Sequence, residues 1–141
     1  TSLMSVFTST VRTSANPMIQ LQALSIAEAY MEEILLKEFD DPEAEDPDLE
    51  VIETNSREAG ETRGNYDDVQ DYNWLEDTKV RDQNNQVISQ LSDYEVTVAV
   101  LGEALGPEAK EISSADSMRI DITVTHPAIS PIKITGYRTN Y

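Results

Sequence analysis

Apolar side chains recur at helical spacing between residues 17 and 39, with polar side chains mostly on the opposite face. Asn16 is a favourable N-cap, and Pro17 suits the first position of a helix. The apolar stripe consists of Ile19, Ala23, Ile26, Ala27, Tyr30 and Ile34, and it is widened by Leu21, Leu24, Met31 and Leu35. The opposite face carries Gln22, Ser25, Glu28, Glu32 and Glu33. This pattern predicts an amphipathic helix with a broad buried face.

The same spacing continues upstream of Pro17, where Leu3, Phe7 and Val11 stand among serines and threonines. Pro17 therefore either begins the helix or bends one longer helix over residues 1–37. The longer helix would measure about 55 Å at 1.5 Å per residue. The rest of the chain would make a globule only about 30 Å wide. We expect a helix over 1–37 whose overhang uses Leu3, Phe7 and Val11 as an interface.

Residues 38–77, here called the acidic belt, interrupt the apolar pattern. Sixteen Asp and Glu residues face only Arg57 and Arg63, which leaves a formal charge of −14 in this segment. We predict a long loop region over residues 38–92, with a short strand at Leu49–Glu53 and a turn at Asn84–Asn85. The belt is expected to be a solvated face, as charge runs usually are. Its two arginines are expected to be internal ion-pair partners rather than ligand-binding groups.

Beyond residue 92 the apolar positions alternate with polar ones, which is typical of half-buried strands. Three strands are predicted, at 94–100, 118–125 and 132–137. The connections at 102–115 and 127–131 suit an antiparallel meander, and Pro127 with Pro131 suits the second turn. Residues 93–141 should thus form an antiparallel sheet of about three to four strands. The predicted fold class is α+β, with the helix stripe covering the sheet within one globular domain.

Composition narrows the possible functions. The 141 residues include 27 Asp and Glu against 10 Lys and Arg, a net charge of −17, and no cysteine. Phosphate backbones and anionic lipid surfaces repel such a chain, so nucleic acid is not an expected partner. Without cysteine there is no disulfide and no thiolate chemistry. No run approaches the roughly 20 apolar residues that span a bilayer.

Catalytic signals are weak. His126 is the only histidine, and it directly precedes Pro127 at a strand end. We interpret it as a structural or an exposed histidine, and the register that it shares with Val124 would point it inward at the rim of the sheet. No nucleophile elbow, P-loop or dinucleotide-binding glycine pattern occurs. We therefore expect no enzymatic activity.

One cluster in the acidic belt has calcium-type chemistry. Asp67, Asp68 and Asp71 offer three carboxylates on a predicted loop, and Ca²⁺ prefers such oxygen ligands. Their spacing does not match the EF-hand pattern. The alternative is that Asp67 and Asp68 cap a turn. In that alternative the loop is anchored to the core by Tyr66, Val69, Tyr72 and Trp74.

Several blocks of the chain resemble a known family when taken together. The segment 14–20, SANPMIQ, leads to 27–35, AEAYMEEIL; then come 61–73, ETRGNYDDVQDYN, and 136–141, GYRTNY. In order and spacing they resemble type IV pilin-like proteins, most closely the D-type minor pilins of the mannose-sensitive haemagglutinin (MSHA) pilus. The resemblance does not extend over residues 43–56 or 102–117.

The resemblance implies a type IV pilin fold, in which the carboxyl half of a long N-terminal helix packs on an antiparallel sheet. It also implies an apolar segment upstream of Thr1 that anchors the precursor in the inner membrane. The domain would be periplasmic first and extracellular in the pilus later. Partners would be other major and minor pilins, contacted through Leu3, Phe7 and Val11. A role in adhesion would add a surface or a glycan as a ligand.

The expected role is therefore a non-enzymatic minor pilin in pilus assembly or in a tip complex. Two alternatives stay open. The first is a minor pseudopilin of a type II secretion system. The second is a calcium- or glycan-binding module that uses the acidic belt.

Overall fold

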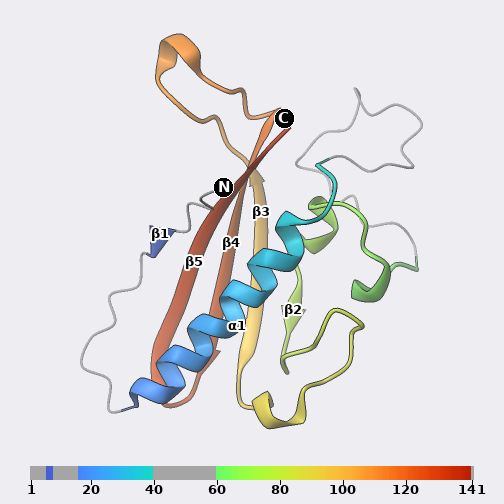
Figure 1. The fold of residues 1–141 in the computed structure, drawn as a ribbon, viewed down its shortest axis with the longest axis vertical. Coiled ribbons are helices and arrows are strands. Elements are labelled where there is room, and N and C mark those ends of the chain that lie inside the picture. The colour runs from blue at the N-terminus through green and yellow to red at the C-terminus, as the bar shows by residue number, and fades with distance from the viewer. Residues whose placement is uncertain (1–5, 8–15, 40–59, 141) are drawn as a thin grey trace.

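The computed structural model describes residues 6–7, 16–39 and 60–140, and it has one long helix lying across an antiparallel sheet (Figure 1). The helix α1 spans Pro17–Leu35. The strands are β1 (Val6–Phe7), β2 (Glu76–Asp77), β3 (Glu95–Gly102), β4 (Ser117–His126) and β5 (Ile129–Thr139). Short 3₁₀ turns occur at Arg63–Asn65, Gln70–Tyr72, Ser89–Leu91 and Glu108–Lys110. The α+β prediction is confirmed.

The sheet has the order β1-β5-β4-β3-β2, with three long strands flanked by two-residue edges. The long strands pair as the predicted meander, and Val98, Ile122 and Ile134 lie in register across it. The turn between β4 and β5 is shorter than predicted, because β5 already begins at Ile129. Pro131 lies inside β5 at a bulge, where Ser130 and Pro131 stand opposite one residue of β4. A bulge tolerates proline because the ladder is already interrupted there.

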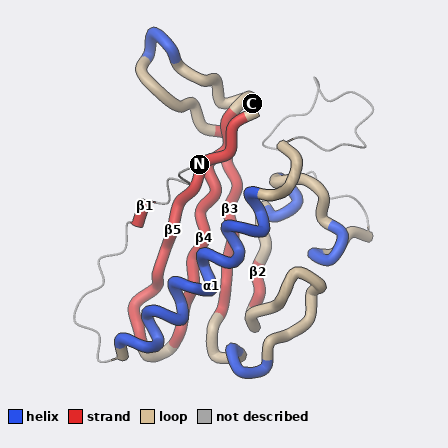
Figure 2. Tube along the Cα trace, in the orientation of Figure 1, coloured by secondary structure: helices blue, strands red, loops and turns tan. Residues whose placement is uncertain are grey.

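The core lies between α1 and the strands, as the helical spacing predicts (Figure 2). Ala23, Ile26, Ala27, Tyr30 and Ile34 are all buried, while Ile19 is only half-buried. Leu21 is 65 % exposed, so its predicted place in the buried face is wrong. Burying this stripe removes a continuous apolar face of the helix from water. The sheet makes room for it at one glycine. A Cβ at Gly136 would stand 2.7 Å from Sδ of Met31.

The start of the helix corrects one expectation. Asn16 is the N-cap and Pro17 is the first helical residue, so Pro17 begins the helix rather than bending a longer one. Val6 and Phe7 form β1 and pair with Thr135 and Ile134 of β5, so the continuous helix over 1–37 is wrong at these positions. Leu3 and Val11 lie outside the described residues. Within the described part of the chain, no helix is both long and apolar enough to cross a membrane.

The loop region follows the prediction in part. The expected strand at Leu49–Glu53 and the residue Arg57 lie outside the described residues. The turn at Asn84–Asn85 is present, and Asn85 has a left-handed φ of 64°. Oδ1 of Asp82 stabilises this turn by accepting the backbone N–H groups of Asn84 and Gln86, each at 2.9 Å. The segment 60–92 therefore has a defined structure on the flank of α1.

Candidate functional site

A buried arginine, Arg63, joins the acidic belt to the helix. It lies in the 3₁₀ turn that follows Thr62, where Thr62 and Asn65 form a reciprocal capping box. Nε and Nη2 of Arg63 donate to the two carboxylate oxygens of Glu33 at 3.1 and 2.6 Å. Nη1 donates to Oδ2 of Asp77 at 3.1 Å. One guanidinium thus binds two carboxylates, one on α1 and one on β2, and we call these three residues the arginine clamp.

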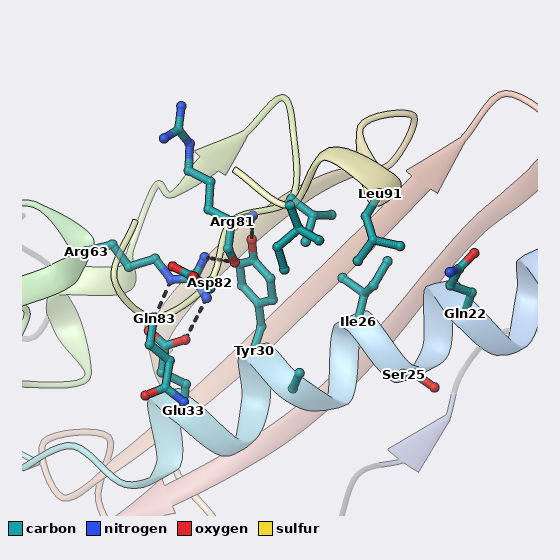
Figure 3. A pocket seen from close by; sticks show the side chains of 13 residues that line it. Gln22, Ser25, Ile26, Tyr30, Glu33, Arg63, Arg81, Asp82, Gln83 and Leu91 are labelled. Atoms are coloured by element: carbon teal, nitrogen blue, oxygen red, sulfur yellow. Dashed lines mark hydrogen bonds and ion pairs between the residues drawn. The ribbon is translucent and has the colours of Figure 1, made fainter. Parts of the chain in front are cut away.

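Two tyrosines complete the arginine clamp, and Figure 3 shows one of them, Tyr30, beside Arg63 and Glu33. The hydroxyl of Tyr72 donates to Oε1 of Glu33 at 2.7 Å, and that of Tyr30 donates to Oδ2 of Asp77 at 2.7 Å. The guanidinium of Arg63 also stacks over the Tyr30 ring, 4.0 Å from its centroid. Buried charges are stable when they are paired and their remaining bonding sites are used. The clamp meets both conditions.

Burial sets the protonation of these groups. It raises the pKa of Tyr30 and of Tyr72, and the neighbouring carboxylates of Asp77 and Glu33 raise them further. Burial opposes the charge of Arg63, but its hydrogen bond to Glu33 and its further interactions with Glu33 and Tyr30 together outweigh this effect, so its pKa lies above the ordinary value. Both hydroxyls are therefore protonated at neutral pH and act only as donors to the carboxylates. The arrangement holds two segments together and leaves neither tyrosine poised as a base.

The arginine clamp forms one end of a cavity of about 440 Å³ between α1 and residues 80–91. Its walls are largely apolar, with Ile26, Ala29 and the Tyr30 ring on the helix side and Val80, Ile88 and Leu91 opposite. Polar groups of the lining are Gln22, Ser25, Glu33, Arg63, Arg81, Asp82 and Gln83. Several of these are already hydrogen-bonded within the protein: Oε1 of Gln22 accepts from Tyr94, and the hydroxyl of Ser25 donates to the Leu21 carbonyl. The cavity suits an apolar group better than a charged one.

The predicted calcium ligands are only partly brought together. Carboxylate oxygens of Asp67, Asp71 and Glu61 lie within 4.8 Å of one another, whereas Asp68 is not in this group. Glu61 was not among the predicted ligands. Calcium binding stays a prediction, and calorimetric titration with calcium chloride tests it. Heat of binding together with a raised melting temperature would support the site. The absence of both effects at physiological ionic strength would exclude it.

The capping alternative is confirmed for Asp68. Its Oδ1 accepts the backbone N–H groups of Gln70 and Asp71 at 2.6 and 3.1 Å, at the start of a 3₁₀ turn. Oδ2 of Asp71 accepts the N–H of Asp67 at 3.1 Å. Asp68, Asp71 and Asp77 are all buried, so the expectation of a fully solvated belt is wrong for them. Asp68 and Asp71 can be buried because they accept hydrogen bonds from backbone N–H groups, and Asp77 can be buried because it accepts one from Arg63.

The predicted anchors of the loop are confirmed with one exception. Tyr66, Val69 and Tyr72 are buried, and the rings of Tyr66 and Tyr72 meet edge to face at 4.9 Å between centroids. Trp74 is 72 % exposed, so its predicted anchoring role is wrong. Arg63 confirms its predicted role as an internal ion-pair partner.

His126 lies at the rim of the sheet in a structural setting. Its Nδ1 accepts the N–H of Ala128 at 3.0 Å, across the turn to β5. Its ring lies 4.6 Å from that of Tyr94, centroid to centroid. These contacts make His126 part of the turn and support its interpretation as a structural residue.

The sequence reasoning missed Glu33, which was assigned to the polar face of the helix. A usable signal was its position between Tyr30 and Ile34, next to the apolar stripe, together with an isolated arginine in the acidic belt. Comparison of the chain with models of known protein families, with curated proteins and with solved structures found no match. The interpretation of this site therefore depends on its own geometry.

Proposed function

We propose that this chain is a non-enzymatic minor pilin of an MSHA-like type IV pilus, acting in pilus assembly or in a tip complex. The observation that carries the proposal is the arrangement of α1 over β4 and β5, which is compatible with the helix-on-sheet fold that the sequence resemblance implies. The blocks with that resemblance include most of α1, the segment 61–73 and the end of β5. In this proposal the anchored inner-membrane precursor has a periplasmic domain, which later becomes part of the extracellular pilus.

The arginine clamp supports a scaffold role. It ties the acidic belt to the middle of the domain through Glu33 and Asp77, and its polar atoms bond to one another rather than facing a reaction site. A subunit that must keep its shape while neighbours pack around it benefits from such a fixed loop. The first turns of α1 also expose two large apolar side chains one turn apart, Met18 and Leu21. Neighbouring exposed apolar side chains mark contact surfaces when they form a contiguous patch.

A gene deletion tests the proposal in the organism that encodes the chain. We expect fewer surface pili or weaker surface adhesion, with both restored by the complete gene supplied in trans. Complementation with Met18→Asp and Leu21→Asp tests the outward face of α1, and an exposed substitution elsewhere, Val87→Asp, is the matched control. Unaltered piliation together with unaltered adhesion in the deletion strain would contradict both roles.

The neighbouring genes separate this proposal from a minor pseudopilin, because pilus operons and secretion operons differ. In a pseudopilin, loss of the gene would reduce protein secretion instead of pilus number. A glycan array probed with the isolated chain tests the remaining alternative, a glycan-binding module. Binding there without any pilus phenotype would favour that module over the pilin.

A further inference from the structure

The only tryptophan of the chain occupies a turn position that disfavours large side chains. The N–H of Leu75 donates to the carbonyl of Tyr72 at 3.1 Å, which closes a β-turn over residues 72–75. Asn73 has φ −63° and ψ 135°, and Trp74 has φ 67°. These angles are those of a type II turn, in which the third residue needs a positive φ and is usually Gly or Asn. Trp74 therefore holds a conformation that glycine adopts without steric cost.

Trp74 does not gain burial in return for this strain. Its side chain is 72 % exposed, whereas the flanking Asn73 and Leu75 are both buried. A tryptophan that serves folding normally covers a large apolar area. A residue with an unfavourable backbone angle and a solvent-exposed ring is better explained by a contact outside the domain.

The turn holds this ring on a rigid base. Oδ1 of Asn73 accepts the N–H of Val100 at 3.0 Å, and the carbonyl of Leu75 accepts the N–H of Val98 at 3.0 Å. Both bonds fix the turn to β3. Large aromatic side chains that are fixed before binding lose little conformational freedom when a partner arrives, and they are frequent hot spots of interfaces.

The net charge of the chain indicates the chemistry of the partner. That charge is −17. Two residues after Trp74, Glu76 is exposed at the start of β2. The face of a tryptophan ring attracts cations more strongly than the other aromatic side chains do. An exposed tryptophan ring on a strongly acidic chain therefore favours a Lys or Arg side chain as its occupant.

We propose that Trp74 is the anchor of a docking site for a basic segment of a partner protein. A Lys or Arg side chain of that segment stacks on the ring, and the net negative charge of the chain attracts the remaining positive charge of the segment. Anionic partners such as nucleic acid are disfavoured by the same charge. The proposal concerns the isolated domain, so its test does not depend on the presence of a pilus.

The test uses a labelled, end-capped peptide of alternating lysine and serine, with a glutamate–serine peptide for comparison. Fluorescence anisotropy of the label gives the affinity for the native chain and for the variants. Quenching of Trp74, the sole tryptophan, reports contact at the ring independently. Trp74→Gly removes the ring and relieves the backbone, Trp74→Tyr keeps an aromatic face, and Val87→Ala is the control at another exposed apolar residue. Circular dichroism checks that each variant folds.

We expect saturable binding of the lysine peptide that weakens as salt is added. Trp74→Gly should weaken it about three- to tenfold, the loss that corresponds to one cation–π contact. Trp74→Tyr should retain part of the affinity, and Val87→Ala should retain all of it. Three results would overturn the proposal: no saturable binding of the lysine peptide, equal affinity of the native chain and Trp74→Gly, or quenching of Trp74 by a neutral oligosaccharide but not by the peptide.

Discussion

Replacing Arg63 by methionine is the most informative perturbation of the fold. The substitution keeps an unbranched side chain of similar length but removes the guanidinium of the arginine clamp. Glu33 would then be buried without a counter-charge, and Asp77 would keep only Arg81 at 4.0 Å. The side chains of Glu33 and Asp77 are only 6 % and 7 % exposed. Tyr72 and Tyr30 would still donate one hydrogen bond to each carboxylate.

The expected loss follows from the burial of these groups. Removing one partner of a buried ion pair typically costs about 3–5 kcal/mol, because the other charge is left uncompensated. Arg63 neutralises two carboxylates, so we place Arg63→Met at the upper end, about 4–5 kcal/mol of unfolding free energy. Arg81 is the matched control. Its guanidinium is 37 % exposed and reaches Asp77 only at 4.0 Å, so Arg81→Met should cost less than about 1 kcal/mol.

Urea denaturation followed by far-ultraviolet circular dichroism measures both variants against the native chain. The triple variant Glu33→Gln, Arg63→Met, Asp77→Asn should recover more than half of the loss at pH 7. Equal, small effects of Arg63→Met and Arg81→Met would refute the clamp as a stabilising element. A triple variant no more stable than Arg63→Met would refute uncompensated charge as the cause.

Three further predictions concern stability. Because burial raises the pKa of Tyr30 and Tyr72, the folded chain keeps protons that the unfolded chain releases above pH 10. The free energy of unfolding should keep its full value below pH 10 and fall above it by about 1.4 kcal/mol per pH unit for each tyrosine. Denaturation at several pH values measures this fall, and Tyr72→Phe should remove the contribution of one tyrosine. Gly136→Ala should cost about 1–3 kcal/mol, because the new Cβ meets Met31 in a filled core; a melting temperature equal to that of the native chain would contradict this close approach. Trp74→Gly should leave the chain at least as stable as the native one, because the left-handed strain of about 1 kcal/mol disappears while little burial is lost. A clearly lower melting temperature of this variant would mean that the ring packs on the domain.

The regular part of the fold could be predicted because its spacing is regular. The period of the stripe from Ala23 to Ile34 follows the face that α1 buries, and alternation along 94–100, 118–125 and 132–137 follows the faces of β3, β4 and β5. Asn16 and Pro17 marked the helix start through their own backbone preferences. These signals depend on residues close together in the chain, so they can be recognised in a single sequence.

The clamp could not be predicted in the same way. Glu33 looked like a surface residue because its burial depends on Arg63, which is 30 positions away and in an irregular segment. Trp74 looked like an anchor because large aromatic residues are usually buried, whereas its turn geometry turns it outward. Val6 and Phe7 had helical spacing but pair with β5, so a long-range partner decided their conformation. Long-range pairing leaves no period in the sequence.

The natural polypeptide upstream of Thr1 tests the pilin proposal most directly. The measurement is the sequence of the encoding gene upstream of this chain, together with N-terminal sequencing of the protein isolated from cells. The proposal predicts a short basic leader followed by about 20 apolar residues that lead into Thr1. The leader is removed in the mature protein, and the apolar residues stay. A conventional signal peptide cleaved shortly before Thr1, with no apolar segment left in the mature chain, would contradict it.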